Sequence, residues 1–283
     1  MIFDNRPCEL GEGPFWHPIR EQLFWFDIIG KRLLSKNADG PQEWHFPGCV
    51  SAAGLIDRDT LMIASETGLL RFNLDTGAMQ DLVALEADNP DTRSNDGRAD
   101  PFGGFWIGTM GKSGQAGAGA IYRYYRGELR LLYPAITCPN SICFPADGRF
   151  AHFCDSGTRK VMRVALDGDG WPKGTPEVFL DLAATGPEPD GAVIDSAGLL
   201  WLALWGAARV CAYAPDGSLQ HTIAFDAPHT SCPAFGGPDL TTLFCTTALQ
   251  GMDAAARAAS PNAGMTFTAP NVARGQLENK VIL

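Results

Sequence analysis

Three polar side chains occur at the same point of a repeating pattern. Asn95, Asn140 and Asp190 each stand ten positions before an aromatic or aliphatic run, with an Asp, Gly or Pro turn in between. Residues in the same register of a repeat occupy equivalent positions in the fold. If the repeat closes into a ring, these side chains converge on its axis, where they could hold a metal ion or a small substrate.

Glu12 is a fourth candidate. It stands between two glycines in Leu10-Gly11-Glu12-Gly13-Pro14, and its register matches Asn140 and Asp190 apart from a two-residue offset. The alternative is that Glu12 lies in a surface turn. Glutamate, however, is not among the residues that favour turns. Glu12, Asn140 and Asp190 offer two carboxylates and an amide oxygen. Such an all-oxygen set predicts one divalent ion, preferably Ca²⁺, Mg²⁺ or Mn²⁺, with Zn²⁺ or Fe²⁺ tolerated.

The segment Arg93-Ser94-Asn95-Asp96-Gly97 adds a guanidinium, an amide and a carboxylate. Asp96-Gly97 also fits a solvated turn. In the functional interpretation, Asn95 could reach the metal directly or through water. The planar guanidinium of Arg93 offers N–H donors in a fixed geometry to a carbonyl, ring oxygen or hydroxyl of the substrate. We therefore expect Arg93, Asn95 and Asp96 to bind substrate.

The elements that position these residues recur at intervals of roughly 40 to 50 residues, the period of a four-stranded propeller blade. Six apolar runs define the repeat, at Leu23–Phe26, Leu61–Ala64, Phe105–Gly108, Phe150–Phe153, Leu200–Ala203 and Leu243–Thr246. Hairpin turn signals lie between strand-like segments. The sequence predicts an all-β fold, a six-bladed β-propeller with a central metal site, as a single domain over residues 1–283.

Several loops are expected to share the face of the polar residues. They are the glycine-rich segment 111–119, residues 155–157, Trp205-Gly206 and an insertion at 247–262. The glycines predict that 111–119 is a mobile lid. Within the insertion, Asp253–Ser260 predicts a short helix that ends at Pro261. Among the histidines, only His229 is a candidate for the rim.

The composition excludes several classes of protein. The formal net charge of −10 argues against nucleic acid and against an anionic membrane surface, since both bind a basic face. The N-terminus has no secretory signal pattern, and no apolar stretch is long enough to span a bilayer. The 8 cysteines form no Cys-x-x-Cys pair. We expect a cytoplasmic protein with reduced cysteines, a monomer or weak homo-oligomer that acts on a small molecule.

Familiar catalytic motifs are missing. Gly111-Lys112-Ser113 imitates the end of a phosphate-binding loop, but Trp106 stands where that loop needs a glycine. The chain has no Gly-x-Ser-x-Gly and no His-Glu-x-x-His, which argues against a serine hydrolase and a zinc protease of those types.

Five motifs carry a family resemblance. They are Leu10-Gly11-Glu12-Gly13-Pro14, Arg93-x-Asn95-Asp96-Gly97, Pro139-Asn140-Ser141, Pro189-Asp190-Gly191 and Phe235-Gly236-Gly237-Pro238-Asp239. In this order, over residues from about 8 to about 250, the set resembles the gluconolactonase/senescence-marker-protein (regucalcin-like) family of sugar lactone hydrolases. The resemblance implies a six-bladed propeller with one catalytic divalent ion that hydrolyses aldonolactones to aldonic acids.

The resemblance also implies roles for individual residues. Glu12, Asn140 and Asp190 would be the metal ligands, and Asp190 the general base. Asn95 would hold substrate and a metal-associated water, and Arg93 would contact the lactone. The metal would polarise the lactone carbonyl while Asp190 takes a proton from the attacking water.

One departure concerns the sugar. Where some members of the family carry an acidic residue, this chain reads Gly111-Lys112-Ser113. Lys112 on the rim would favour a substrate with a carboxylate, sulfonate or phosphate. Two other functions stay open: a promiscuous esterase or organophosphate hydrolase on the same scaffold, and a calcium-binding propeller without catalysis.

Overall fold

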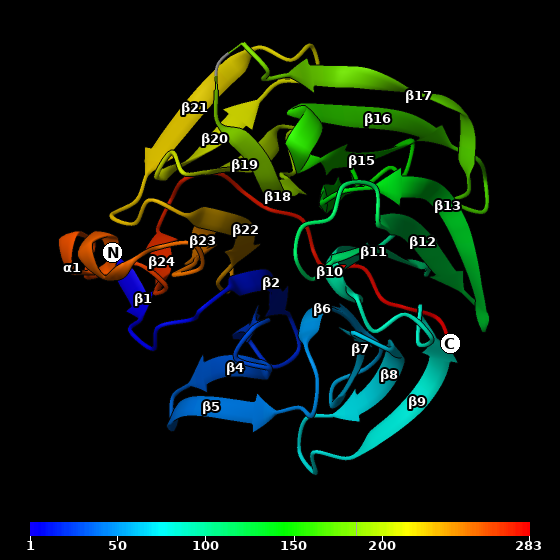
Figure 1. Cartoon of the computed structure of the whole chain (residues 1–283), viewed down its shortest axis with the longest axis horizontal. Coiled ribbons are helices and arrows are strands. Elements are labelled where there is room, and N and C mark those ends of the chain that lie inside the picture. The colour runs from blue at the N-terminus through cyan, green and yellow to red at the C-terminus, as the bar shows by residue number, and fades with distance from the viewer. Residues whose placement is uncertain (185) are drawn as a thin grey trace.

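A ring of six antiparallel sheets makes up the protein. The computed structural model describes residues 1–184 and 186–283, and these residues form six four-stranded sheets around one axis (Figure 1). In five of the sheets the strands follow chain order from the axis outward. The predicted six-bladed β-propeller is confirmed.

The strands fall into four concentric positions. The innermost strands are β2 (Gly11–His17), β6 (Val50–Leu55), β10 (Thr92–Ala99), β14 (Pro139–Cys143), β18 (Glu188–Ile194) and β22 (Thr230–Gly236). The second strands are β3 (Gln22–Asp27), β7 (Thr60–Ser65), β11 (Phe105–Gly111), β15 (Phe150–Asp155), β19 (Leu200–Trp205) and β23 (Thr242–Thr247). The third strands are β4 (Arg32–Asn37), β8 (Gly68–Asn73), β12 (Gly119–Tyr125), β16 (Lys160–Leu166), β20 (Arg209–Tyr213) and β24 (Thr266–Ala269). The outermost strands are β5 (Gly40–His45), β9 (Met79–Ala84), β13 (Glu128–Ile136), β17 (Pro172–Asp181), β21 (Leu219–Ala224) and β1 (Ile2–Asp4).

The two ends of the chain close the ring together. The sixth sheet has the order β22-β23-β24-β1, so the N-terminal strand is its outermost member. In the β1–β24 pairing, Ile2 is the partner of Phe267. Backbone hydrogen bonds between the first and last segments thus hold the ring shut.

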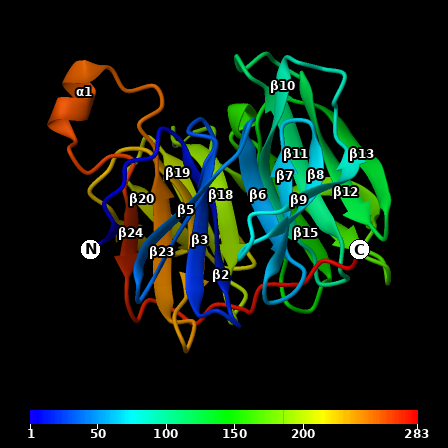
Figure 2. The same ribbon diagram turned by 90° about the horizontal axis from the view of Figure 1, so that it is seen from below.

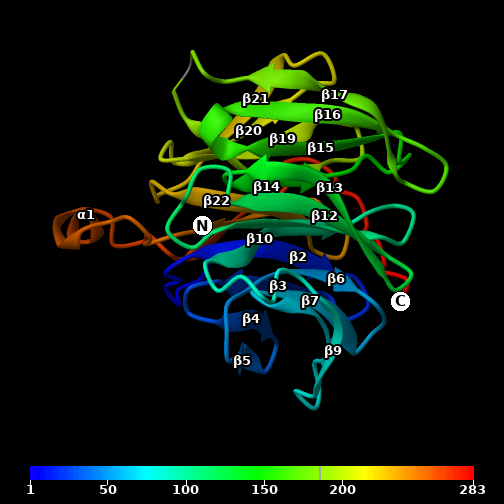
Figure 3. The same ribbon diagram turned by 45° about the vertical axis from the view of Figure 1, so that its right-hand side comes forward.

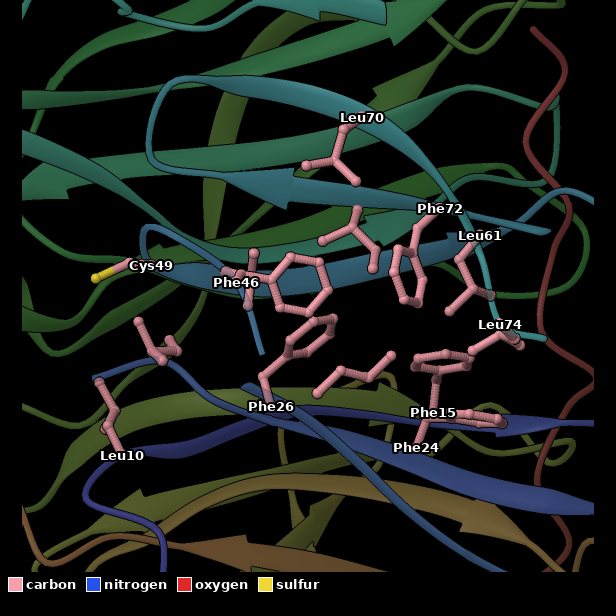
Figure 4. Packing of buried hydrophobic residues seen from close by; sticks show 14 of the residues in the cluster. Leu10, Phe15, Phe24, Phe26, Phe46, Cys49, Leu61, Leu70, Phe72 and Leu74 are labelled. Carbon is pink, nitrogen blue, oxygen red and sulfur yellow. The ribbon is translucent and has the colours of Figure 1, made fainter. Parts of the chain in front are cut away.

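The core lies between neighbouring sheets. Each second strand is covered on both faces by the adjacent blades, which explains its continuous apolar sequence. Aromatic rings pack between the first two blades (Figure 4). The ring centroids of Phe15 and Phe24 lie 5.4 Å apart in a stacked pair, and those of Phe46 and Phe72 lie 5.2 Å apart. Burial of these apolar surfaces is the main stabilising contribution to the ring.

The predicted helix in the last blade is confirmed. Helix α1 (Ala254–Ala259) begins after Asp253, whose carboxylate accepts the backbone N–H of Ala256 at 2.8 Å, a typical N-cap. It projects beyond the blades (Figure 3). A short 3₁₀ helix, η1 (Ser156–Thr158), follows β15. In the described part of the chain, no helix has the length and apolarity needed to cross a membrane.

The C-terminal segment crosses the ring on the face opposite α1 (Figure 2). Gly275 donates its N–H to the carbonyl of Leu240, and Ile282 donates to Gly103, both at 2.9 Å. Between them, Glu278 pairs with Arg98 of the innermost strand β10 at 2.6 Å. The segment therefore links blades that lie far apart around the ring.

Candidate metal centre and substrate cavity

Each innermost strand is irregular at the level of the polar residues. The strand register shifts between Glu12 and Phe15, between Asn140 and Cys143, and between Pro189 and Ala192. Similar shifts occur in β6, β10 and β22. A β-bulge bends its strand and redirects the side chains beside it. The repeated bulges bring the polar side chains of separate blades towards the ring axis.

Close contact between innermost strands explains two of the glycines next to these residues. Gly13 has a φ of +54°, and a Cβ there would collide with the Ser51 carbonyl oxygen. A Cβ on Gly191 would collide with Cys232 Sγ. Only glycine lets the bulged strands pack this closely while Glu12 and Asp190 keep their positions.

A cavity of about 450 Å³ opens over the bulges. Six of the residues expected at the site line it: Glu12, Arg93, Asn95, Lys112, Asn140 and Asp190. The structure thus brings together side chains from five strands or loops that are distant in sequence. The volume of this cavity lies in the range typical of small-molecule sites.

A chain of hydrogen bonds connects three blades across the cavity floor. Arg93 Nη1 donates to Asn95 Oδ1 at 2.8 Å, and Asn95 Nδ2 donates to Asn140 Oδ1 at 3.0 Å. Asn140 Nδ2 then donates to Ser156 Oγ at 2.9 Å, which donates to the Pro189 carbonyl at 2.7 Å. The chain fixes the orientation of the Asn140 amide. Asn95 turns its oxygen to Arg93 and supports Asn140 through its nitrogen.

Glu12 and Asp190 form a buried carboxylate pair. Burial, with repulsion from Asp96, raises the pKa of Glu12 to about 8, and the Arg93 charge offsets only part of this. Burial, together with repulsion from Glu12 and Asp96, raises the pKa of Asp190 well above its usual range. Two carboxylates in such surroundings stay ionised together only if positive charge joins them. The pair is therefore suited to a cation.

The donor set at this point fits a hard divalent ion. Glu12 and Asp190 supply carboxylate oxygens, and Asn140 Oδ1 has a second lone pair besides the one that accepts from Asn95. Across the described residues, no group of three or more His, Cys, Asp and Glu side chains could hold a metal. An ion here would therefore depend on the amide oxygen, a ligand that calcium and magnesium accept readily.

Two expected site residues, Asp96 and Lys112, already have partners within the protein. Asp96 is buried, its Oδ2 accepts the Ile142 backbone N–H at 2.8 Å, and burial raises its pKa to about 6. It is not among the described residues that line the cavity, so its position does not support direct contact with substrate. Lys112 lines the cavity, and its Nζ pairs with Glu66 Oε2 at 3.0 Å.

The rim contains residues that the sequence only partly indicates. Lys112, Ser113 and Gly114 of the predicted lid line the cavity, together with Ser156, Trp205 and Gln250 of the other expected rim loops. Mobility of the lid stays a prediction. His229 is not among the described lining residues, but its ring stacks on that of the rim residue Trp205, with the ring centroids 4.3 Å apart.

The cavity is also lined by residues that were not expected at the site: Leu10, Met110, Cys138, Glu188 and Pro189. Burial raises the pKa of the Cys138 thiol to about 12, which argues against a nucleophilic thiolate at that residue. The sequence positions of Cys138, two residues before Asn140, and of Glu188, two residues before Asp190, could have indicated them. Residues two apart on a strand face the same side.

Comparison with known proteins agrees with this architecture. A protein of Rhizobium meliloti (strain 1021), whose name places it provisionally among sugar lactone lactonases, is 41% identical over 95% of this chain and 92% of its own. L-arabinolactonase of Azospirillum brasilense is 35% identical over 95% of this chain and 90% of its own.

Among solved structures, the calcium-binding protein regucalcin from Agrobacterium tumefaciens str. C58 is 37% identical and superimposes with a TM-score of 0.97, covering 100% of this chain and 97% of that one. The signature described as "SMP-30/Gluconolactonase/LRE-like region" matches residues 10–249. The chain therefore belongs to the SMP-30/gluconolactonase/LRE-like family.

Proposed function

We propose that this protein hydrolyses a sugar lactone to the aldonic acid with the help of one divalent ion. The observation that carries the proposal is the buried pair of Glu12 and Asp190 beside the Asn140 amide, on the floor of a cavity of about 450 Å³. The family and its lactonase members supply the class of substrate.

Glu12, Asn140 and Asp190 would hold the ion. When bound, the ion would polarise the lactone carbonyl and lower the pKa of water and of the neighbouring carboxylates. The hydrogen bonds from Asn95 to Asn140 and from Asn140 to Ser156 fix the orientation of the Asn140 amide in the cavity that Glu12 and Asp190 also line. These residues therefore act as a preorganised set.

Asp190 would move the proton in this proposal. Its carboxylate would accept a proton from the attacking water and return it to the ring oxygen as the ester C–O bond breaks. Arg93 lines the cavity, and Nη1 is held by the Ser94 carbonyl and Asn95 Oδ1, both at 2.8 Å. Its other donors can hydrogen-bond the carbonyl oxygen, where negative charge develops during attack.

A matrix of lactones and ions tests the proposal. Metal-free protein is supplied in turn with Ca²⁺, Mg²⁺, Mn²⁺ or Zn²⁺, and acid release from glucono-, galactono- and arabinono-lactones is followed with a pH indicator. We expect ion-dependent turnover, loss of turnover on chelation, and an unchanged circular dichroism spectrum. A cation-replete sample that is inert towards every lactone would refute the proposal.

A second candidate is calcium binding without catalysis, because the similar Agrobacterium tumefaciens structure is named a calcium-binding protein. The same matrix distinguishes the two. A binding protein would take up calcium in a calorimeter while no lactone in the panel is hydrolysed.

A further inference from the structure

A second groove continues from the cavity between the fourth and fifth blades. It is an open groove with a volume of about 520 Å³, and Glu188 and Trp205 line both the groove and the cavity. In the strand pairing, Glu188 stands opposite Trp205, and Arg209 stands opposite Leu204. The groove therefore runs outward from the Asp190 end of β18, across β19, to the start of β20.

The groove carries positive charge in a chain whose formal net charge is −10. Arg159 and Arg209 both line it. Arg159 Nη2 has a long contact of 3.4 Å with Glu188 Oε1. For Arg209, the described residues provide no side-chain hydrogen bond or ion pair. By contrast, Lys112 on the cavity rim has its carboxylate partner, Glu66, at 3.0 Å.

Trp205 forms a flat wall between the two spaces. Its indole is stacked on the His229 imidazole, with the rings 4.3 Å apart and inclined by 12°. The stacking holds the indole in place where it lines both the cavity and the groove, and such an apolar ring can contact the body of a sugar. A ligand extending from Asp190 past Trp205 would reach the arginines.

We propose that the substrate is an aldonolactone with an anionic group, such as a phosphate, sulfonate or carboxylate, at the end remote from its carbonyl, and that Arg209, with Arg159, binds this group. The inference rests on the proposed function and names its substrate class. Two strand spacings, about 10 Å, separate the backbones of β18 and β20. Arg209 can therefore reach a group several bonds away from a carbonyl held at Asp190. An anion at Lys112 would have to displace Glu66, whereas an anion at Arg209 displaces no partner among the described residues.

The test compares 6-phosphoglucono-1,5-lactone and glucono-1,5-lactone as substrates of the ion-loaded protein. We expect kcat/KM to favour the phosphorylated lactone by about tenfold at low salt, as for one charge-assisted contact, and the preference to shrink in salt. Arg209→Gln should remove most of the preference through KM and change the neutral lactone by less than about twofold. Arg149→Gln, at an exposed arginine on the opposite face, is the matched control.

Calorimetry provides a readout that does not need turnover. Titration with 6-phosphogluconate and with gluconate should show tighter binding of the phosphorylated acid, and Arg209→Gln should remove the difference. Equal binding of the two acids, or an equal loss on both lactones in Arg209→Gln, would overturn the inference. If neutral lactones turn over without any preference, only the inference fails. If no lactone turns over, the proposed function fails and calorimetry still decides about the groove.

Discussion

The two buried carboxylates give the site its chemical character. Glu12 and Asp190 approach each other although burial raises the pKa of both. An arrangement of this kind costs stability in the absence of a cation. Apolar side chains could fill the same volume with a smaller loss of stability. We therefore interpret the carboxylate pair as a site for binding and catalysis.

Asp190→Asn should separate binding from catalysis. The amide keeps an oxygen that can face the ion but cannot accept the proton of the attacking water. We expect kcat to fall by about 10² to 10⁴, the usual contribution of a general base, while the thermal midpoint stays equal or rises. Asp147→Asn, at an exposed turn, is the control. Retention of more than about a tenth of the activity would argue against Asp190 as the base.

We expect the buried His152 to make the stability of the protein depend on pH, independently of the active site. Burial and, to a smaller extent, Arg163 lower the pKa of His152 to about 3, from an ordinary value of 6.5. Between these values the unfolded chain binds a proton that the folded protein does not, so stability falls as the pH falls below 6.5.

His152→Phe should remove this contribution, because a phenyl ring can pack on Phe179, whose ring lies 4.9 Å from the imidazole. Urea unfolding between pH 7 and 5 should show that the wild type loses up to about 1.4 kcal/mol more per pH unit than the variant. Parallel pH profiles for the two proteins would contradict the assignment.

At the scale of elements, the innermost strands carry the site and the second strands carry the core. The sequence predicts this division well, since a strand covered on both faces reads as a continuous apolar run, such as Leu200–Ala203. The polar residues ten positions earlier predict the cavity floor. Glu12, Asn140 and Asp190 do lie together, as the register indicates.

The bulges are what the sequence does not reveal. An extra residue in a polar strand leaves no mark on a pattern of period two. The consequence is clearest at Asp96, which follows Asn95 but lies within the register shift between Ser94 and Gly97 and binds the Ile142 N–H.

Gly191→Ala tests the close packing of the innermost strands. The new Cβ would meet Cys232 Sγ, so β18 or β22 must shift. We expect a loss of about 1 to 3 kcal/mol in the free energy of unfolding, measured in urea, and a loss of activity because Asp190 is the preceding residue. Gly168→Ala is the matched control, since no heavy atom lies within 4 Å of its Cβ position. Equal stability of the two variants would refute this packing.

At the scale of the whole molecule, the closed ring and the C-terminal segment hold the site. The N-terminal strand completes the sixth sheet, and the segment across the opposite face joins several blades. Glu278 brings a carboxylate to Arg98, and the two side chains are 15% and 11% exposed. The segment therefore compensates a charge on one of the innermost strands.

Glu278→Ala should leave the Arg98 guanidinium largely buried without its carboxylate. We expect a loss of about 3 kcal/mol in the free energy of unfolding, because an uncompensated buried charge is strongly destabilising. Glu128→Ala, which breaks the exposed pair with Arg130, should lower the free energy of unfolding far less, because exposed ion pairs are screened by water and salt. Replacing both Arg98 and Glu278 with Met and Leu should recover most of the loss. A Glu278→Ala variant as stable as Glu128→Ala would show that the pair is dispensable.

Anomalous diffraction from crystals soaked in Mn²⁺ tests directly whether Glu12, Asn140 and Asp190 hold one ion. We expect one strong peak at the cavity floor, within about 2.5 Å of oxygens from these three side chains. We also expect the peak to weaken in Glu12→Gln crystals. A soaked crystal of active protein with no peak at these three side chains, or with the ion bound elsewhere, would contradict the proposed metal site.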